Sequence, residues 1–212
     1  MKKMYVSFFL SSVAFCITAF RPIAEPFEGI IRYETTVTGE APKAFTERLA
    51  KYYELSFKGK DLKIKGGAPL KCEILLKRNA GKMYIVRIDQ KNVYEVDLND
   101  KRIPENTSKP VVTRVKETLT IGGYSCQKYE LDYGHGLKLY VWTAEAINVE
   151  QLGAAQIFGG QFKLPTEVAG FPLKMQVVSS EFTVSCIATV VKTTSMDAME
   201  FVLPSGMSTK KL

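Results

Sequence analysis

The sequence is poor in the residues that most catalytic and metal sites require. It contains one histidine, His135, and only four cysteines in 212 residues. A single imidazole excludes the three-histidine, two-histidine–glutamate and two-cysteine–two-histidine sets that bind zinc. The chain also lacks the CxxC, GxSxG, GxxxxGK[ST] and GxGxxG motifs of redox, hydrolase, phosphate-binding and dinucleotide-binding sites. We therefore expect no catalytic residue, no metal site and no cofactor.

The lone histidine lies in a turn-like segment. In LDYGHGLKL, His135 stands between Gly134 and Gly136, and strand-like segments flank the three residues. Glycines at such positions supply the positive φ angles of a β-hairpin. No nucleophile accompanies the histidine, so we assign it to an exposed turn rather than to general-base catalysis. A hydrolase with an unrecognised site is only the third functional hypothesis.

The first 24 residues contain no acidic residue and read as a secretory signal peptide. Lys2 and Lys3 precede an uncharged, mainly apolar run from residue 5 to residue 20. A basic start followed by an apolar region is typical of an export signal. The run is shorter than the ~20 residues of a membrane-spanning helix. We expect cleavage near residue 24, leaving residues 25–212 as a single β-rich domain with no stable membrane span, located in the periplasm or cell envelope or secreted.

The cysteines are too few and too scattered to form a disulfide framework. Cys16 lies in the predicted leader and follows Phe15, whereas lipoprotein processing requires a small residue there, so we do not expect a lipid anchor. The remaining three cysteines, Cys72, Cys126 and Cys186, allow at most one internal bridge. An oxidising compartment permits a Cys126–Cys186 or Cys126–Cys72 bridge. The competing and favoured interpretation of Cys126 is a small core residue in a strand.

The positive charge of the chain is modest and dispersed. The formal net charge is +7, and three of the basic residues leave with the leader. In KGKDLKIKGG (58–67) the lysines mostly alternate with other residues, as on the solvent face of a strand. Nucleic-acid binding requires a concentrated basic face. We therefore expect no nucleic-acid partner.

Most of the chain consists of short strand-like segments separated by turn residues. Runs rich in Val, Ile, Tyr and Thr alternate with Gly, Asn and Asp clusters, a pattern typical of antiparallel strands. The expected strand segments are 27–39, 52–67, 71–101, 115–121, 124–133, 137–145, 171–194 and 199–204. In KMYIVRID (82–89), one alternating set is apolar and the other becomes polar, which indicates a sheet with one face in the core. Residues 102–113 read as a loop.

Two segments have helical rather than alternating spacing. In APKAFTERLAKYY (41–53), apolar residues recur every three or four positions after Pro42, a residue suited to a helix start. In TAEAINVEQLGAAQIF (143–158), Val149, Leu152 and Phe158 lie on one stripe, and two glycines follow. We predict a helix over each segment. The fold class is then α+β and mainly β: a large curved, half-barrel-like antiparallel sheet with one or two helices packed on the concave face.

A curled sheet with a helix inside it suggests an apolar groove. Residues of the predicted helix would line it or cover it as a lid, and strand aromatics would complete it. The candidate groove or lid residues are Val149, Leu152, Phe158, Trp142 and Tyr140. Strand aromatics also commonly fill cores, and that alternative stays open.

Several landmarks along the chain resemble a family of exported envelope proteins known only as a domain of unknown function. They are FEGIIRYE (27–34), TLTIGGYSCQKYEL (118–131), LYVWTAE (139–145), GFPLKMQV (170–177) and FVLPSGM (201–207). The resemblance implies a curved antiparallel sheet similar to Lol-type periplasmic lipoprotein carriers, with helices in the concavity. It brings no catalytic residue, and it implies that Cys126 belongs to a structural signature.

The leading functional hypothesis is a non-enzymatic envelope protein that binds an apolar ligand, such as an acyl chain or an acylated lipoprotein partner, in the concavity. The alternative is a structural or interaction module of the envelope without a ligand pocket. The sequence carries no signal for the oligomeric state.

Overall fold

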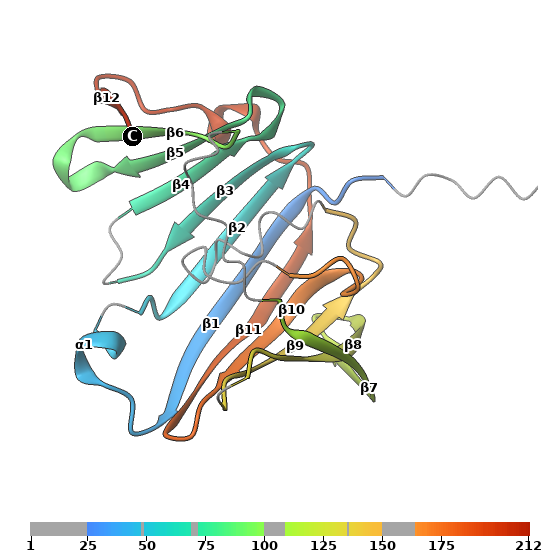
Figure 1. The fold of residues 1–212 in the computed structure, drawn as a ribbon. Coiled ribbons are helices and arrows are strands. Elements are labelled where there is room, and N and C mark those ends of the chain that lie inside the picture. The colour runs from blue at the N-terminus through green and yellow to red at the C-terminus, as the bar shows by residue number, and fades with distance from the viewer. Residues whose placement is uncertain (1–24, 48, 69–71, 100–108, 135, 150–163) are drawn as a thin grey trace, which may run out of the picture.

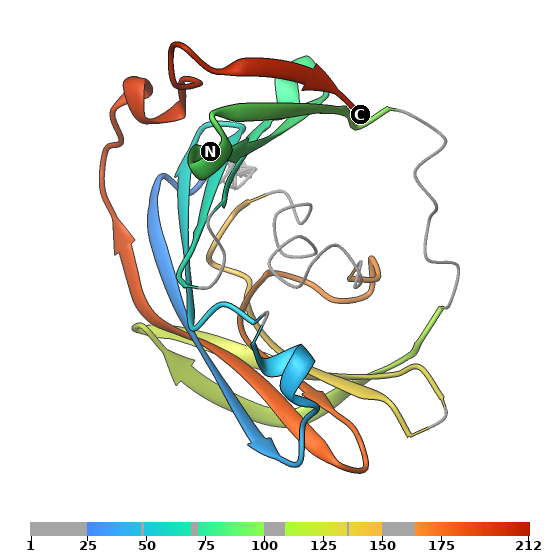
Figure 2. The ribbon, with the colours of Figure 1, turned by 90° about the vertical axis from the view of Figure 1, so that its left-hand side faces the viewer.

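The computed structural model describes residues 25–47, 49–68, 72–99, 109–134, 136–149 and 164–212. These residues form one large, open, curved sheet of 12 strands (Figures 1 and 2). The strands are β1 (Gly29–Gly39), β2 (Tyr52–Lys58), β3 (Asp61–Gly66), β4 (Cys72–Lys77), β5 (Lys82–Arg87), β6 (Asn92–Asp97), β7 (Val111–Ile121), β8 (Tyr124–Asp132), β9 (Lys138–Ala144), β10 (Phe171–Val178), β11 (Phe182–Thr193) and β12 (Ser208–Lys211). The predicted mainly-β fold with a large curved sheet is confirmed. The predicted leader, residues 1–24, lies outside the described residues.

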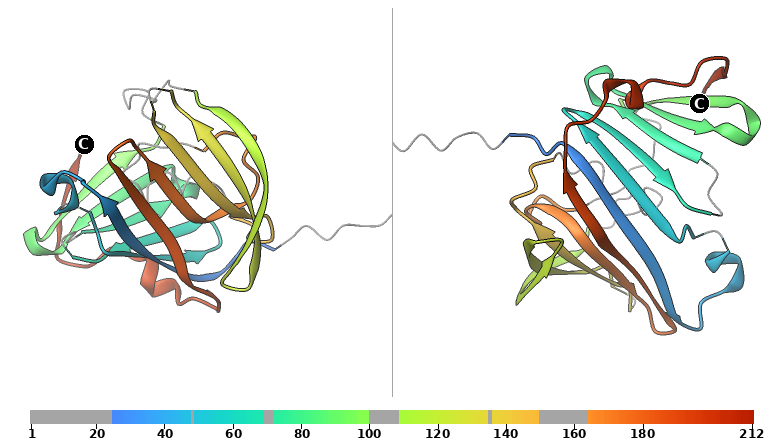
Figure 3. Two further views of the ribbon diagram at one scale, coloured as in Figure 1. Left: turned by 90° about the horizontal axis from the view of Figure 1, so that it is seen from below. Right: turned by 180° about the vertical axis from the view of Figure 1, so that it is seen from behind.

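The sheet consists of two meanders joined through its longest strands. Strands β1 to β6 follow one another in space, and so do β7 to β11, while β1 pairs with β11 to link the two sets. All these pairings are antiparallel. Strand β12 instead pairs in parallel with β6 and forms one edge of the sheet, and β7 forms the other. Figure 3 shows the two ends of the sheet turning toward each other around the concave side.

Local turn chemistry sets the register of the hairpins. Gly122 and Gly123 join β7 to β8 with φ angles of 56° and 85°, which favour glycine. Gly81 ends η1 (Arg78–Ala80) between β4 and β5 in a left-handed conformation. Lys91 does the same after η2 (Ile88–Gln90) between β5 and β6, at a φ of 51°. The turns at Gly81 and Lys91, together with the one at residues 58–61, divide the predicted strand segments 52–67 and 71–101 into the separate strands β2 to β6.

The main core lies on the concave face. Alternate residues of neighbouring strands meet there in cross-strand rows, such as Tyr129–Val141–Met175–Cys186 across β8, β9, β10 and β11. Phe57 packs edge-on between Phe27 and Phe171, with ring centroids 5.6 and 5.5 Å apart. The described segments that follow β9 and precede β10 lie inside the curve of the sheet (Figure 2), and their residues Ile147, Leu164 and Val168 belong to the buried main core.

A second, smaller core lies on the convex face. Phe201, which is 1% exposed, and Met196 pack there on Leu75, together with the partly buried Ile30 and Tyr84. The segment after β11 brings Phe201 into place through η3 (Ala198–Phe201), whose first turn is capped by Asp197. Tyr84 and Val86 belong to the fully apolar set of β5 that we expected in the core, and they lie on this convex face. The other set, which we expected outside the core, lies on the concave face, where Met83 packs against the main core. The expectation of a single buried face is wrong for this half of the sheet.

Other predictions also need correction. In the described part of residues 41–53 the helix is limited to the four residues of α1 (Lys43–Thr46), and Tyr52 and Tyr53 pair with β1 instead. The predicted helix 143–158 is wrong for its described part, 143–149, where Thr143 and Ala144 end β9 and a turn follows; the remainder lies outside the described residues. Hence no described helix packs on the concave face. The predicted strand 199–204 is wrong, since residues 199–201 belong to η3 and residues 202–204 are irregular, and β12 was not predicted.

Candidate functional site

The concave face carries a group of partly exposed apolar side chains at the β4–β6 end. They form two cross-strand rows, and we call them the β4–β6 patch: Ile74, Met83, Ile85, Tyr94 and Val96. Residues on the same face of β9 and β10, such as Val141 and Met175, are by contrast almost completely buried. The concave face is therefore filled at one end and retains accessible apolar surface at the other.

Two cationic side chains border the β4–β6 patch. Lys210 of β12 lies opposite Tyr94, and its Nζ is 5.9 Å from the centre of the Tyr94 ring. Arg87 ends β5 in the next row on the same face, between Cys72 of β4 and Asn92 of β6. Its Nε and Nη2 each lie 3.3 Å from a carboxylate oxygen of Asp89. This contact raises the pKa of Arg87 and lowers that of Asp89, so both groups are ionised at neutral pH.

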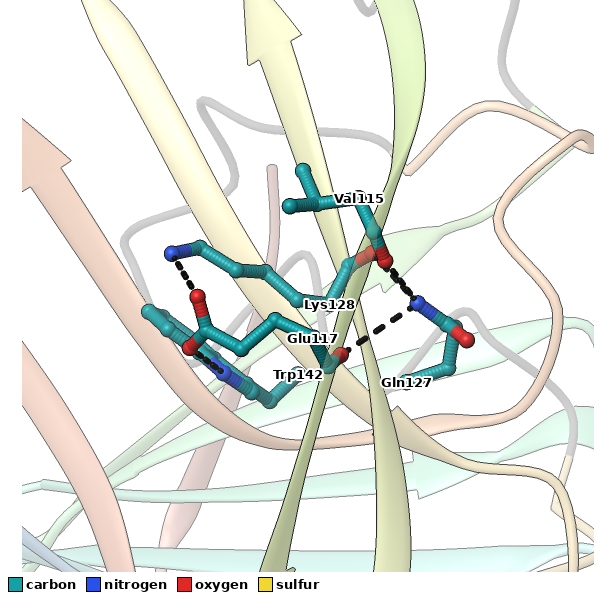
Figure 4. Close-up of polar contacts among 5 residues, drawn as sticks. All are labelled: Val115, Glu117, Gln127, Lys128 and Trp142. Carbon is teal, nitrogen blue, oxygen red and sulfur yellow. Dashed lines mark hydrogen bonds and ion pairs between the residues drawn. The ribbon is translucent and has the colours of Figure 1, made fainter.

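The opposite face of β9 carries Trp142 between two lysines. Trp142 pairs with Lys128 of β8 and Lys174 of β10, and their Nζ atoms lie 4.9 and 4.2 Å from its ring. Glu117 accepts hydrogen bonds from Lys128 Nζ at 2.7 Å and from Trp142 Nε1 at 3.3 Å (Figure 4). These bonds lower the pKa of Glu117. The group has the features of a satisfied structural cluster, since Trp142 is only 3% exposed.

A bulge in β7 brings Glu117 to this cluster. The register of β7 against β8 shifts between Arg114 and Thr118, leaving three residues of β7 opposite Lys128. The side-chain amide of Gln127 fills the irregularity by donating to the carbonyl oxygens of Val115, at 2.5 Å, and Glu117, at 3.4 Å (Figure 4). Bulges of this kind redirect side chains and interrupt an edge strand.

The predicted groove residues are only partly placed by the structure. Val149 is partly buried against the main core, whereas Leu152 and Phe158 lie outside the described residues. Tyr140 and Trp142 alternate along β9 with the core residues Leu139 and Val141, so they project from the other face. The structure does not bring these two aromatics to the β4–β6 patch. Sequence reasoning missed that patch, although the alternation in segment 71–101 contained its residues.

The described cysteines are free thiols. Cys126 and Cys186 are completely buried in β8 and β11, with β9 and β10 between them. Three strand spacings separate them by about 14 Å along the sheet, too far for a disulfide. The structure therefore does not contain the Cys126–Cys186 bridge that the sequence permitted, and the favoured interpretation of Cys126 as a buried strand residue agrees with its placement.

Burial also governs the ionisation of the groups near these thiols. It raises the pKa of Cys186 to about 12 and raises that of Tyr33 as well. The Tyr33 hydroxyl donates a 2.6 Å hydrogen bond to the carbonyl oxygen of Pro172, which satisfies it in the core. Thr35 Oγ1 lies 3.9 Å from Cys186 Sγ. Neutral, satisfied groups of this kind indicate a structural role.

Within the part of the chain that the structure describes, no three His, Cys, Asp or Glu side chains are grouped so as to hold a metal ion. No helix in that part is long and apolar enough to span a membrane. His135 lies outside it, between Gly134 and Gly136, whose φ angles are 79° and 77°.

Residues 27–207 match the model of a family described as "Domain of unknown function (DUF4412)". No protein with a curated description matches the sequence. Among solved structures, PNGF-II is similar in fold, with a TM-score of 0.52 at 16% identity over 86% of this chain. The chain corresponds to only 30% of the PNGF-II chain in that crystal form and to 32% in a second one.

Other solved structures match at lower TM-scores. The MucA/MucB complex of Pseudomonas aeruginosa gives 0.45 at 8% identity, with 84% of this chain and 57% of that chain covered. A LolA superfamily protein from Nitrosomonas europaea gives 0.38 at 11% identity, with 84% and 90% covered. Similarities of this size carry no inference about function.

Proposed function

This chain belongs to the DUF4412 family, a domain of unknown function, and we propose that it is an exported, non-enzymatic envelope protein that binds an apolar chain on the concave face of its sheet. The sequence supports export through its basic and then apolar first 24 residues. The absence of catalytic motifs from the sequence supports a binding role rather than an enzymatic one. The ligand class is proposed from the chemistry of the concave face.

The observation that carries the proposal is the partial exposure of the β4–β6 patch. Folded proteins bury aliphatic side chains where they can, because each buried methylene contributes about 0.8 kcal/mol. Ile74, Ile85 and Tyr94 form one row and face the inside of a curved sheet, yet remain accessible. A concave apolar surface is the usual form of a site for an apolar ligand. An acyl chain laid on these rows would remove them from water.

Titration with a fluorescent fatty-acid probe tests this proposal directly. We expect saturable binding to the wild-type protein and binding weakened at least tenfold in Ile85→Glu, because a carboxylate would enter the apolar row. Ile88→Glu is the matched control, since Ile88 lies three residues away in a turn and is 54% exposed. Circular dichroism establishes that both variants remain folded. Equal affinity of both variants, or no saturable binding by the wild type, would contradict the proposal.

The alternative of an interaction module without a ligand is supported by the filled part of the concavity. Ile147, Leu164 and Val168, from the segments between β9 and β10, already belong to the buried main core. Absence of probe binding, together with co-purification of a specific envelope protein through the convex face, would favour this second function.

A further inference from the structure

The side chains around the β4–β6 patch carry charge of a definite sign. The patch itself is uncharged, and the two long polar side chains that border it on the concave face, Lys210 and Arg87, are both basic. The acids of β4 and β6 alternate onto the other face, where Glu73 pairs with Lys63 and Glu95 with Lys82. The described concave surface at this end is thus apolar with a cationic border.

Lys210 is the more available of the two cations. It lies on the exposed edge strand β12, and no described carboxylate lies within 4.0 Å of its Nζ. Lysines on the convex face, by contrast, form ion pairs within that distance. Its amino group instead lies over the Tyr94 ring. Arg87 is shared with Asp89, which lies in the exposed η2 turn. The border therefore retains net positive charge after the Arg87–Asp89 pair is counted.

We propose that the ligand of the concave face is a long-chain carboxylate, a free fatty acid, whose alkyl chain lies on the β4–β6 patch and whose carboxylate binds Lys210 and Arg87. This inference rests on the proposed function and specifies its ligand. Successive rows on one strand face are about 7 Å apart and neighbouring strands about 4.8 Å apart. One carboxylate beside Tyr94 is therefore within reach of the flexible Lys210 and Arg87 side chains, while the alkyl chain extends over Ile85 and Met83 toward β4.

The Tyr94 side chain suits this position. It lies between the two cations, in the same row as Lys210 and one row from Arg87. A phenol presents an apolar ring to the alkyl chain and a polar hydroxyl to the head group. A wholly neutral acyl chain would make no use of the basic border, whereas a carboxylate gains from each cation.

Paired ligands separate this inference from the proposed function. Palmitic acid and hexadecanol have chains of the same length and differ in head-group charge at pH 8, and each is titrated by displacement of an apolar fluorescent probe. We expect the wild type to bind palmitate about three- to tenfold more tightly than hexadecanol, as expected for two partly exposed ion pairs. The Arg87→Gln/Lys210→Gln variant should lose that preference and retain hexadecanol binding.

Lys82→Gln/Lys211→Gln is the matched control, because these neighbouring lysines lie on the same two strands but alternate onto the other face. It should keep the preference for palmitate. Equal affinity of the wild type for the two ligands would overturn the head-group assignment and leave the apolar site intact. Binding of neither ligand would overturn both proposals.

Cys72 provides an independent measurement of where the ligand lies. It is partly exposed in the same row as Arg87, whereas Cys126 and Cys186 are buried. Saturating palmitate should slow alkylation of Cys72 severalfold in the native protein. An unchanged rate at saturation would show that the carboxylate binds elsewhere and would overturn the assignment.

Discussion

At the scale of single residues, the three described cysteines differ in their exposure to solvent, and their reactivity should differ accordingly. Burial raises the pKa of all three described cysteines, to about 12 for Cys186, and only Cys72 is partly exposed. A raised pKa leaves less reactive thiolate at a given pH. We expect iodoacetamide at pH 8 to modify Cys72 before the other two cysteines. The reaction of Cys72 should be slower than that of a free cysteine, and its rate should increase as the pH rises through 9.

Intact-protein mass spectrometry over a time course measures this order. Cys126 and Cys186 should react only after unfolding in guanidinium, which serves as the control for their intrinsic reactivity. Modification of Cys186 as rapidly as Cys72 in the native protein would contradict the burial described above.

At the scale of elements, η3 fixes the C-terminal segment to the convex face through one aromatic side chain. Phe201 is 1% exposed, whereas Met199 of the same short helix is 71% exposed. Phe201→Ala should lower the free energy of unfolding by about 3–5 kcal/mol, the usual cost of a buried phenylalanine. Met199→Ala, the control, should change it by less than about 0.5 kcal/mol. Urea denaturation of the two variants compares them, and equal effects would contradict this role of Phe201.

A charged contact near β1 holds the same segment. Glu28 accepts hydrogen bonds from the Met196 amide at 2.7 Å and from Lys58 at 3.2 Å, and these bonds lower the pKa of Glu28 below 4.5. A carboxyl group with a depressed folded-state pKa contributes stability above its unfolded pKa and loses it as the pH falls through the folded value. Hydrogen exchange of residues 194–203 should therefore accelerate, relative to β1, as the pH falls through the lowered pKa of Glu28.

Glu28→Gln removes the titrating group and should abolish this additional acid sensitivity while β1 exchanges as before. Retention of the same pH dependence in Glu28→Gln would assign the effect to another carboxyl group.

The sequence was sufficient for those elements that local chemistry determines. Glycines at 59, 81, 122 and 123 mark hairpins, and alternation marks the strands between them. The helix predicted over 143–158 failed in its described part because Val149 packs against the core from irregular backbone, and apolar residues in such a segment resemble one face of a helix. Strand β12, STKK, was missed because an exposed edge strand has no apolar alternation.

The candidate site could not be predicted from the sequence, because its residues are brought together by strand pairing rather than by local pattern. Tyr94, Ile85 and Lys210 come together only through the register of β5, β6 and β12, and the parallel return of β12 to β6 has no local signal. Tyr140 and Trp142 were assigned to the groove only because they are aromatic residues in a predicted strand. One step in the alternation of β9 decides which face they occupy.

At the scale of the whole molecule, the open sheet has two edges that are protected differently. Strand β7 carries a bulge with charged residues, and the edge of β6 is covered by the fully exposed β12. Deleting residues 208–212 would uncover the unpaired backbone groups of β6, which favour pairing with another chain. We expect the truncated protein to self-associate at concentrations where the full-length chain does not.

Sedimentation velocity at matched concentrations measures this difference. Ser208→Ala/Thr209→Ala is the control, because it changes side chains of β12 and keeps its backbone pairing. Identical sedimentation of the truncated and full-length proteins would show that β12 does not protect the edge.

The central position of β1 has a consequence for biogenesis. Its partner on one side, β2, follows soon after it in the chain, but its other partner, β11, begins only at Phe182. During synthesis the outer edge of β1 therefore stays unpaired until some 140 further residues have emerged. Contacts between residues so distant in sequence make folding slow. One edge of β1 is therefore unpaired, and accessible to chaperones, during most of the synthesis of the chain.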